Sequence, residues 1–170
     1  QRAAIAALNG SLDAVEEMFP AALRYLGLNP DSKNEADLNE AGELLRKIRP
    51  HIQKFHSSEY INALANGDIC LAVGYSGDIL QAKKRAEEAK NGVQIAYSIP
   101  KEGALMWFDS LVIPKDAGNV EAAMKFIDFV NKPEMAAKNS DFIQYANGNL
   151  ASKPFLSAAV RDNPGIYPSD

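Results

Sequence analysis

Apolar residues recur along the chain at two spacings, one typical of helices and one typical of strands. The helical spacing predicts helices over residues 38–48, 60–66, 77–90 and 120–130, a short helix opened by Pro133, and another at 157–161. Capping residues support these ends: Ser57 or Ser58 before the second helix, Asn66-Gly67 after it, Ser76 before the third and Asn119 before the fourth. The chain is therefore predicted to be rich in helix.

Three further segments have strand character. Residues 69–73 form a continuous apolar run, residues 93–99 alternate apolar with polar or small positions, and residues 104–113 are the most apolar stretch. Strands separated by helices favour a sheet with helices packed on it, so the predicted fold class is α/β. A weak boundary falls near Gly103, where strand follows strand with no helix between them.

Charge and composition narrow the class of protein. The 170 residues carry a net charge of −4 with both signs interspersed, which excludes the basic footprint of a nucleic-acid binder. No apolar run approaches the roughly 20 residues that span a bilayer, so no membrane insertion is predicted. No basic and then apolar leader opens the chain, and a signal peptide is not expected within it. The single cysteine, Cys70, lies in the apolar run 69–73 and is interpreted as a small core residue.

Most signatures of catalysis and of cofactors are missing from the sequence. It contains no Gly-x-Gly-x-x-Gly, no P-loop, no His-Glu-x-x-His and no cysteine pair for zinc, so neither a cofactor nor a metal is predicted. His51 and His56 are interpreted as structural or surface residues. Asn9-Gly10-Ser11 is a glycosylation sequon by its letters and is interpreted as a turn before a helix.

Carboxylates beside aromatic residues are the candidate ligand-binding groups. Asp109 interrupts the apolar run 104–113, and in a strand Trp107 would share its face. An indole and an anion side by side suit an alkylammonium group, held by a charge-assisted hydrogen bond and a cation–π contact. The alternative is a structural pairing of Asp109 with an internal cation or a helix N-terminus.

A second cluster follows the apolar run 69–73. Gly74-Tyr75-Ser76-Gly77-Asp78 joins the end of a predicted strand to the start of a helix, where ligands bind in open α/β sheets. Asp78 could instead complement the dipole of that helix, and Tyr75 could be a rim residue.

With these motifs the chain resembles the polyamine-binding (putrescine/spermidine) periplasmic receptors of bacterial ABC importers. The resemblance runs from about Leu12 onward and includes Leu64-Ala-Asn-Gly-Asp-Ile-Cys70, Gly74-Tyr-Ser-Gly-Asp78, Ala89-Lys-Asn-Gly-Val93, Ile99-Pro-Lys-Glu-Gly-Ala104, Trp107-Phe-Asp109, Tyr145-Ala-Asn147 and Asn163-Pro-Gly-Ile-Tyr-Pro168. It implies a type II periplasmic-binding-protein-like α/β lobe with helices packed on a mixed sheet, as part of a two-lobe fold that closes on its ligand.

The resemblance also implies roles for individual residues. The carboxylates of Glu17, Asp78 and Asp109 would contact the ligand amines, and three aromatic residues would surround the methylene chain: Tyr75, Trp107 and Tyr145. Two departures stand out, because the position of Tyr75 is commonly Trp in these receptors and the cysteine that some members pair with Cys70 is absent here.

Length is the largest departure, since receptors of this family are roughly twice as long. The resemblance assigns residues 1–103 to a portion of the second lobe and residues 104–170 to chain returning to the first lobe. A fragment, one half of a split chain and an engineered or incomplete chain all remain open. The expected partners are a polyamine, the ABC permease, and either the complementary half or a second copy.

The predicted function is non-catalytic binding of a linear polyamine (putrescine, cadaverine or spermidine) in the periplasm for an ABC importer. Two alternatives from other classes remain. One is an interaction module or split lobe that binds a partner chain through the Trp107 face. The other is an enzyme using Asp78 or Asp109 with His56 as acid and base.

Overall fold

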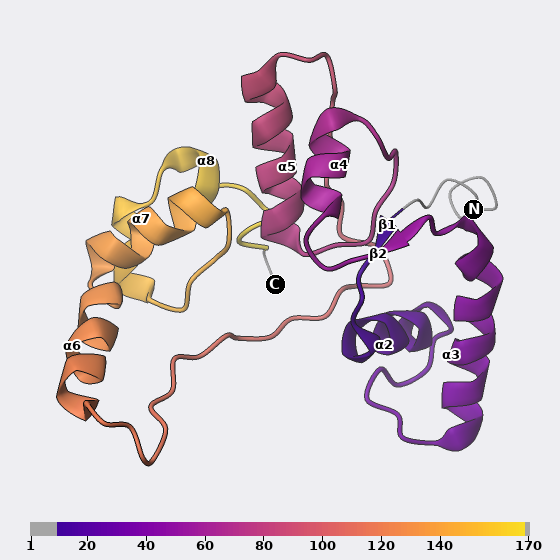
Figure 1. Cartoon of the computed structure of the whole chain (residues 1–170), viewed down its shortest axis with the longest axis horizontal. Helices are drawn as coiled ribbons and strands as arrows, with labels where there is room; N and C mark the ends of the chain where they lie inside the picture. Colours follow the sequence, from indigo (N-terminus) through magenta and orange to yellow (C-terminus); the bar gives the residue numbers. More distant parts are fainter. Residues whose placement is uncertain (1–9, 169–170) are drawn as a thin grey trace. The chain divides into compact units, whose positions relative to one another are not determined.

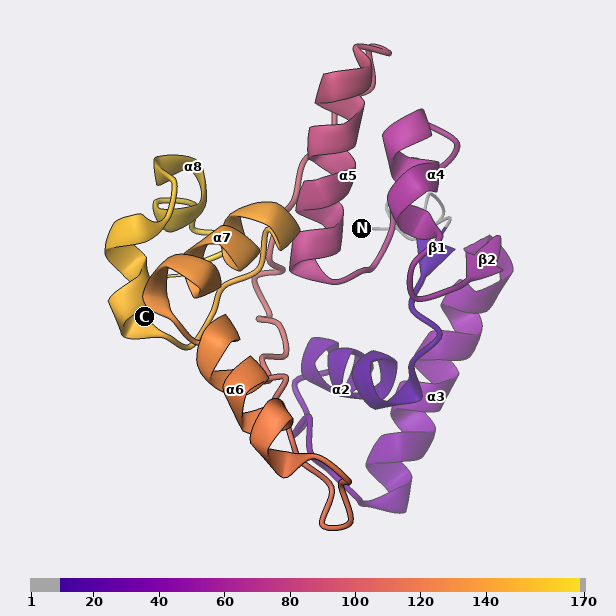
Figure 2. The ribbon, with the colours of Figure 1, turned by 60° about the vertical axis from the view of Figure 1, so that its left-hand side comes forward.

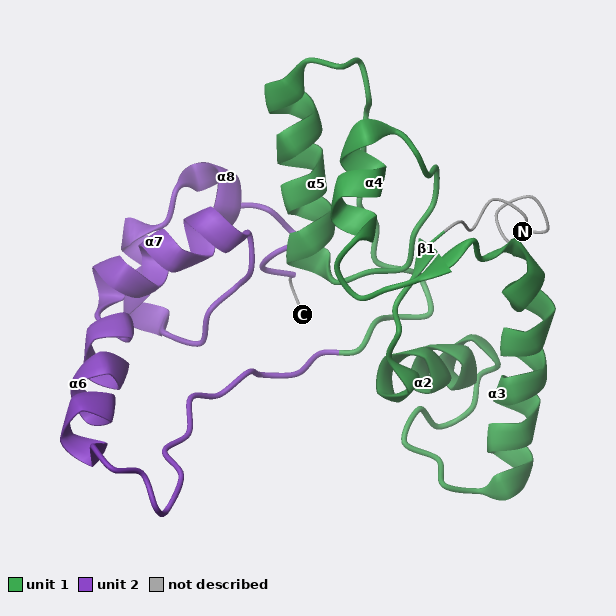
Figure 3. Ribbon diagram, viewed as in Figure 1, with its two compact units in different colours: residues 1–105 green, residues 106–170 purple. Residues whose placement is uncertain are grey.

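The structure, a computed structural model, describes residues 10–168. The chain divides into two compact units, residues 1–105 and residues 106–170 (Figure 3). The first unit contains, in order, β1 (Gly10–Ser11), α2 (Val15–Tyr25), α3 (Glu35–Ile48), the 3₁₀ turn η1 (Arg49–His51), β2 (Lys54–Phe55), α4 (Tyr60–Asn66) and α5 (Ser76–Ala89), as labelled in Figure 1. The second contains α6 (Val120–Val130), α7 (Pro133–Ile143), the 3₁₀ turn η2 (Leu150–Phe155) and α8 (Ala158–Arg161). The assignment of these units to the lobes of a receptor stays a prediction.

A small parallel sheet lies at the centre of the first unit. β1 pairs with β2 in the register Gly10 to Lys54 and Ser11 to Phe55, and Gly10 also forms a parallel bridge to Ala72. Close approach explains a glycine here, because a Cβ on Gly10 would meet Cδ1 of Ile69 at 3.1 Å. The turn expected at Gly10-Ser11 was therefore wrong, since both residues pair with β2 and Gly10 also pairs with Ala72; Asn9 lies outside the described residues.

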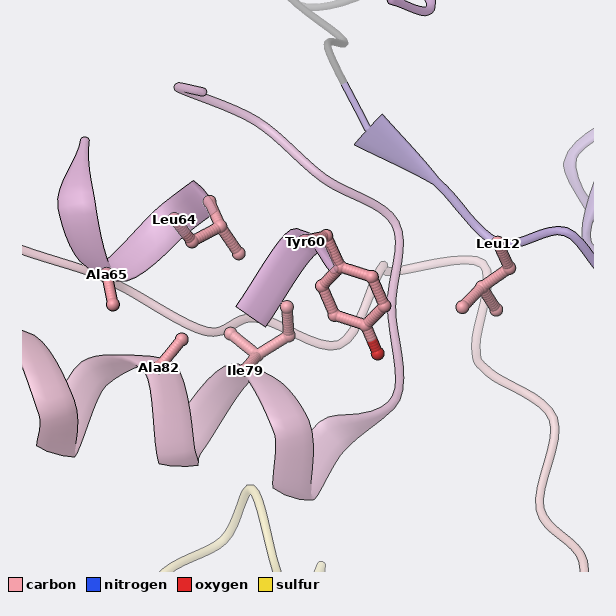
Figure 4. Packing of buried hydrophobic residues seen from close by; sticks show 6 residues of the cluster. All are labelled: Leu12, Tyr60, Leu64, Ala65, Ile79 and Ala82. Carbon is pink, nitrogen blue, oxygen red and sulfur yellow. The ribbon is translucent and has the colours of Figure 1, made fainter. Parts of the chain in front are cut away.

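Two helix pairs flank this sheet. α2 packs on α3 over a small core of Ala22, Leu23 and Ala41, and the two views in Figures 1 and 2 agree on this pairing. α4 packs beside α5 over a second core, shown in Figure 4. Its buried members are Leu12, Tyr60, Leu64, Ala65, Ile79 and Ala82. Small alanines at the contacts let each helix pair approach closely.

The helix ends confirm some of the capping residues predicted from the sequence and contradict others. Asn119 caps α6 by accepting a 2.9 Å hydrogen bond from the Ala122 N–H, as expected, and Gly67 ends α4 in the left-handed conformation at φ 81°. The expected serine cap of α4 was wrong. The backbone N–H groups of Ser58 and Glu59 donate instead to Nδ1 of His56, at 3.1 and 3.2 Å.

The start of α5 also differs from the expectation. Ser76 is the first helical residue rather than the cap, and Tyr75, with an extended backbone, occupies the cap position. Asp78 therefore falls in the first turn of the helix, where its negative charge interacts favourably with the positive end of the helix dipole.

The three predicted strands do not form as such among residues 10–168. Segment 69–73 contributes only the bridge at Ala72, and segments 93–99 and 104–113 carry no strand assignment. The physical reason is that an apolar run becomes a strand only where a neighbour accepts its backbone hydrogen bonds. Cys70, expected in the core, is correspondingly exposed.

The second unit is held by short helices and side-chain amides. Ala136, Ala137, Leu156 and Val160 are buried in it, and α7 packs on η2. Pro133 opens α7 as predicted. α6 has no buried residue among those described, so its apolar side chains contribute little to this core.

Candidate ligand-binding site

Three of the six predicted site residues lie in the first unit, and hydrogen bonds connect them. Glu17 lies in the first turn of α2, Tyr75 precedes α5, and Asp78 lies in the first turn of α5. The Tyr75 hydroxyl donates a 3.3 Å hydrogen bond to Oε1 of Glu17. Two helix N-termini are thereby joined through an aromatic side chain and a carboxylate.

The two carboxylate oxygens of Glu17 differ: one accepts the hydrogen bond from Tyr75, and the other has no partner among the described residues. Oε2 is buried and has no hydrogen-bond partner among the described residues. A buried carboxylate oxygen without a donor is costly, and such an atom calls for a donor from outside the chain. The second oxygen of Glu17 is thus an acceptor in this unit to which a ligand could donate a hydrogen bond.

The environment of Tyr75 keeps its hydroxyl neutral. Burial raises the pKa of Tyr75 above its ordinary value, and the negative charge and hydrogen bond of Glu17 raise it further. A neutral phenol retains its proton, so it can donate to Glu17 and present its ring face to a cation. Burial likewise raises the pKa of Tyr97, which packs against the same core.

Asp78 is tied to the same cluster by a residue that sequence reasoning missed. The hydroxyl of Tyr60 donates a 2.7 Å hydrogen bond to Oδ2 of Asp78 and accepts a 3.0 Å bond from the backbone N–H of Tyr75. No local pattern marks Tyr60 as part of a site, because it lies 18 residues from Asp78 and reads as an apolar helix position.

The glycine before Tyr75 is required by the same side chain. A Cβ on Gly74 would lie 2.5 Å from Cε2 of the Tyr60 ring, closer than real contacts allow. Gly74 therefore lets the ring pack directly against the backbone that leads into α5.

The other three predicted residues belong to the second unit. Trp107 and Asp109 lie in an irregular segment and both are exposed, Trp107 by 50%. Tyr145 follows α7 and is half-buried. The strand that would have placed Trp107 and Asp109 on one face is not formed, so their shared face stays a prediction.

The loop that carries Tyr145 is fastened by Asn147. The Asn147 side chain donates to Oγ of Ser140 at 2.8 Å and accepts from Oγ of Ser152 at 2.9 Å. Its backbone N–H donates to the hydroxyl of Tyr167 at 3.2 Å. These bonds fix the 145–149 loop within its own unit.

Neither metal-binding nor membrane-spanning features mark the described chain. Among residues 10–168 no group of three or more His, Cys, Asp and Glu could hold a metal ion. Within the same residues, every helix is too short or too polar to cross a membrane.

Comparisons with known proteins identify the class to which this fold and site belong. Residues 3–168 match the family of bacterial extracellular solute-binding proteins, and the chain belongs to that family. This membership confirms the α/β receptor fold predicted from the motifs.

The most informative relatives are receptors for polyamines. The chain is 57% identical to the putrescine-binding periplasmic protein SpuD of Pseudomonas aeruginosa, over 94% of this chain and 43% of SpuD. It is 52% identical to the putrescine-binding periplasmic protein PotF of Escherichia coli, over 92% of this chain and 43% of PotF. These matches confirm the resemblance to the putrescine/spermidine receptors.

Solved structures agree with the sequence relatives. A chain from Listeria monocytogenes, assigned as a spermidine/putrescine ABC transporter, superposes with a TM-score of 0.83 at 31% identity, covering 96% of this chain and 48% of that one. A spermidine/putrescine substrate-binding protein from Streptococcus pneumoniae gives 0.76 at 29% identity, over 96% and 49%. The chain therefore spans less than half the length of the relatives that it matches.

Proposed function

We propose that this chain supplies part of the binding cleft of a periplasmic receptor that captures a linear polyamine for an ABC importer. It acts by binding and not by catalysis. The observation that carries the proposal is the Glu17 carboxylate, with one oxygen held by Tyr75 and the other buried without a partner in residues 10–168. An ammonium group would supply the missing donor and neutralise the charge.

The pairing of Glu17 with Tyr75 suits an amine better than other ligands. A charge-assisted hydrogen bond contributes about 1.5–3 kcal/mol, and a desolvated cation–π contact about 1–2 kcal/mol. An anionic ligand would meet a buried negative charge at the same place and be repelled. A neutral sugar would leave that charge uncompensated.

A diamine requires a second anion at its far end and apolar walls between the two. Asp78 and Asp109 are proposed as the further carboxylates, and Tyr75, Trp107 and Tyr145 as the aromatic walls. Trp107 and Asp109 are exposed and therefore accessible to a ligand. The similarity to SpuD and PotF, both putrescine-binding periplasmic proteins, supports a diamine and a periplasmic location.

Isothermal titration tests the proposal. The sample for titration is a chimeric receptor, in which this chain replaces the matching 43% of the Pseudomonas aeruginosa relative SpuD. Putrescine, cadaverine and spermidine are titrated in turn, and we expect micromolar affinity, about 8 kcal/mol, for at least one of them. Heat with an anionic ligand and none with any polyamine would overturn the proposal.

A pair of variants localises the binding. Glu17→Gln removes the charge and should weaken binding at least about ten-fold. The matched control is Glu121→Gln, which removes an exposed carboxylate paired with Lys125 on α6. Equal affinity of Glu17→Gln and the control would remove Glu17 from the site.

A second candidate function, docking to another chain, is favoured by one observation. Apolar side chains of the second unit are exposed along one segment and one helix: Met106, Trp107, Phe108, Leu111, Val112, Val120, Met124, Phe126 and Phe129. Surfaces of this kind are seldom bare on a soluble monomer. Association and ligand capture are compatible, because a receptor half could do both.

A further inference from the structure

Tyr60 is a polar side chain within the hydrophobic core of the first unit. It is the first residue of α4, its exposure is 4%, and it packs with Leu12, Leu64 and Ile79. Figure 4 shows its ring among these apolar side chains with the hydroxyl at the outer end. A buried hydroxyl must be hydrogen-bonded to be tolerated, and this one bonds to Asp78 and to the Tyr75 backbone, in the region where α5 begins.

The directions of these two hydrogen bonds are determined by their partners. The backbone N–H of Tyr75 can only donate, so the Tyr60 oxygen is its acceptor. The proton of the hydroxyl is then left for Oδ2 of Asp78, an acceptor at 2.7 Å. A single hydroxyl thus holds a side chain and a backbone group that belong to two proposed ligand residues.

The ring of Tyr60 adds a third constraint. It packs so closely on Gly74 that no Cβ fits there. Tyr75 follows directly, and its hydroxyl reaches Glu17 at 3.3 Å. Any shift of the Tyr60 ring would therefore move the backbone that aims Tyr75 at Glu17.

We infer that Tyr60 is a positioning residue of the polyamine site: its hydroxyl orients the Asp78 carboxylate and, through the Tyr75 backbone, the Tyr75–Glu17 pair. This inference rests on the function proposed above. A carboxylate that is already oriented loses less freedom when the ligand binds, so preorganisation raises affinity without a contact between Tyr60 and ligand.

The test compares Tyr60→Phe with Tyr167→Phe. Both changes delete a hydroxyl that accepts a backbone N–H and keep the ring, but the Tyr167 hydroxyl accepts from Asn147 in the second unit. In the 170-residue chain, hydrogen exchange at the Tyr75 amide should accelerate at least about ten-fold in Tyr60→Phe and stay unchanged in Tyr167→Phe. That readout separates loss of this particular bond from general loosening, which would also accelerate exchange at core amides such as Leu64.

Titration of the chimeric receptor supplies the second readout. Tyr60→Phe should weaken putrescine binding about ten-fold. In an Asp78→Asn background the same change should cost about two-fold or less, because the two residues act as one unit.

The outcomes distinguish the inference from the proposed function. If the unchanged receptor binds no polyamine, the proposed function fails and the inference fails with it. If it binds and Tyr60→Phe binds equally well, or if the two changes are additive, only the inference fails. Selective exchange at Tyr75 together with non-additive loss of affinity supports it.

Discussion

The hydroxyl of Tyr75 donates a hydrogen bond to the carboxylate of Glu17 across 58 residues of sequence. The bond satisfies one oxygen of Glu17, whereas the other is buried and has no partner in the part of the chain that the structure describes. It also orients the ring of Tyr75 beside a negative charge. An aromatic face next to a half-satisfied carboxylate is the arrangement from which the proposed amine site is built.

Replacing Tyr75 tests its role in ligand choice. An indole has a larger π-surface than a phenol and can donate a hydrogen bond but not accept one. We expect Tyr75→Trp to change the ranking of putrescine, cadaverine and spermidine without abolishing binding. The relative binding free energies of the three should shift by no more than about 1.5 kcal/mol. Titration of the chimeric receptor with each polyamine measures this, and an unchanged ranking would place Tyr75 outside the site.

The ionisation of Tyr75 provides a pH-dependent test. Its pKa in the folded chain is raised above the unfolded value by burial and by Glu17. The unfolded state therefore loses this proton first, and the contribution to stability, complete below the unfolded pKa of about 10, declines as pH rises through the folded pKa. Unfolding in denaturant across alkaline pH should show a weaker decline in Tyr75→Phe than in the parent chain.

Glu17 should account for part of the raised pKa of Tyr75. In Glu17→Gln the charge is gone while burial remains, so the pKa of Tyr75 should fall part of the way toward its ordinary value. Ring-carbon NMR resolves this tyrosine from the others. The control is Glu43→Gln, which removes an exposed carboxylate of α3 paired with Arg46, and it should leave the titration of Tyr75 unmoved.

Two glycine-to-alanine changes should have opposite signs. At Gly74 the new methyl group would overlap the Tyr60 ring, and overpacking of this kind costs about 1–3 kcal/mol. At Gly42, inside α3, the nearest atom is Cζ of Phe19 at an ordinary 3.9 Å, and alanine should stabilise the helix by up to about 1 kcal/mol. Chemical denaturation of both variants gives the signs, and a neutral Gly74→Ala would show that the ring moves freely.

His56 should matter to stability, unlike His51. The ring nitrogen Nδ1 of His56 accepts the backbone N–H groups of Ser58 and Glu59 ahead of α4. Its removal in His56→Ala should cost about 0.5–1.5 kcal/mol, the range of a lost hydrogen bond. His51 is exposed, and His51→Ala should stay within about 0.5 kcal/mol. Equal losses of stability for His56→Ala and His51→Ala in thermal unfolding would contradict this role of His56.

The 170-residue chain by itself should bind polyamines at least about 100-fold more weakly than the chimeric receptor, because its carboxylates then meet the ligand in water. It should also associate through the exposed apolar side chains of segment 106–112 and of α6. Light scattering during the titration follows both. Phe126→Gln should reduce association; Phe142→Gln, at a 78% exposed position on α7, serves as the matched control. Micromolar binding by a monomer would contradict this expectation.

Local sequence signals were sufficient to predict most of the helices and to indicate the family of the protein. The period of Leu38, Leu45 and Ile48 predicts α3, and Asn119 predicts the start of α6, because helix formation depends on residues within one or two turns. The motifs around Gly74 and Trp107 were sufficient to indicate a polyamine receptor, since short ordered motifs are specific even without a structure.

The tertiary structure decided what depends on distant partners. A strand exists only where another segment accepts its hydrogen bonds, so the apolar runs 93–99 and 104–113 are extended chain and Cys70 is exposed. α4 has no side-chain cap from a serine, and the His56 ring instead accepts the backbone N–H groups of the turn before the helix, because the geometry of the turn determines which acceptor reaches the backbone. Tyr60, which is an apolar helix position by its pattern, is linked to Asp78 and Tyr75 only once α4 packs on α5. Long-range hydrogen bonds of this kind leave no period or motif in the sequence, because their partners are brought together by packing alone.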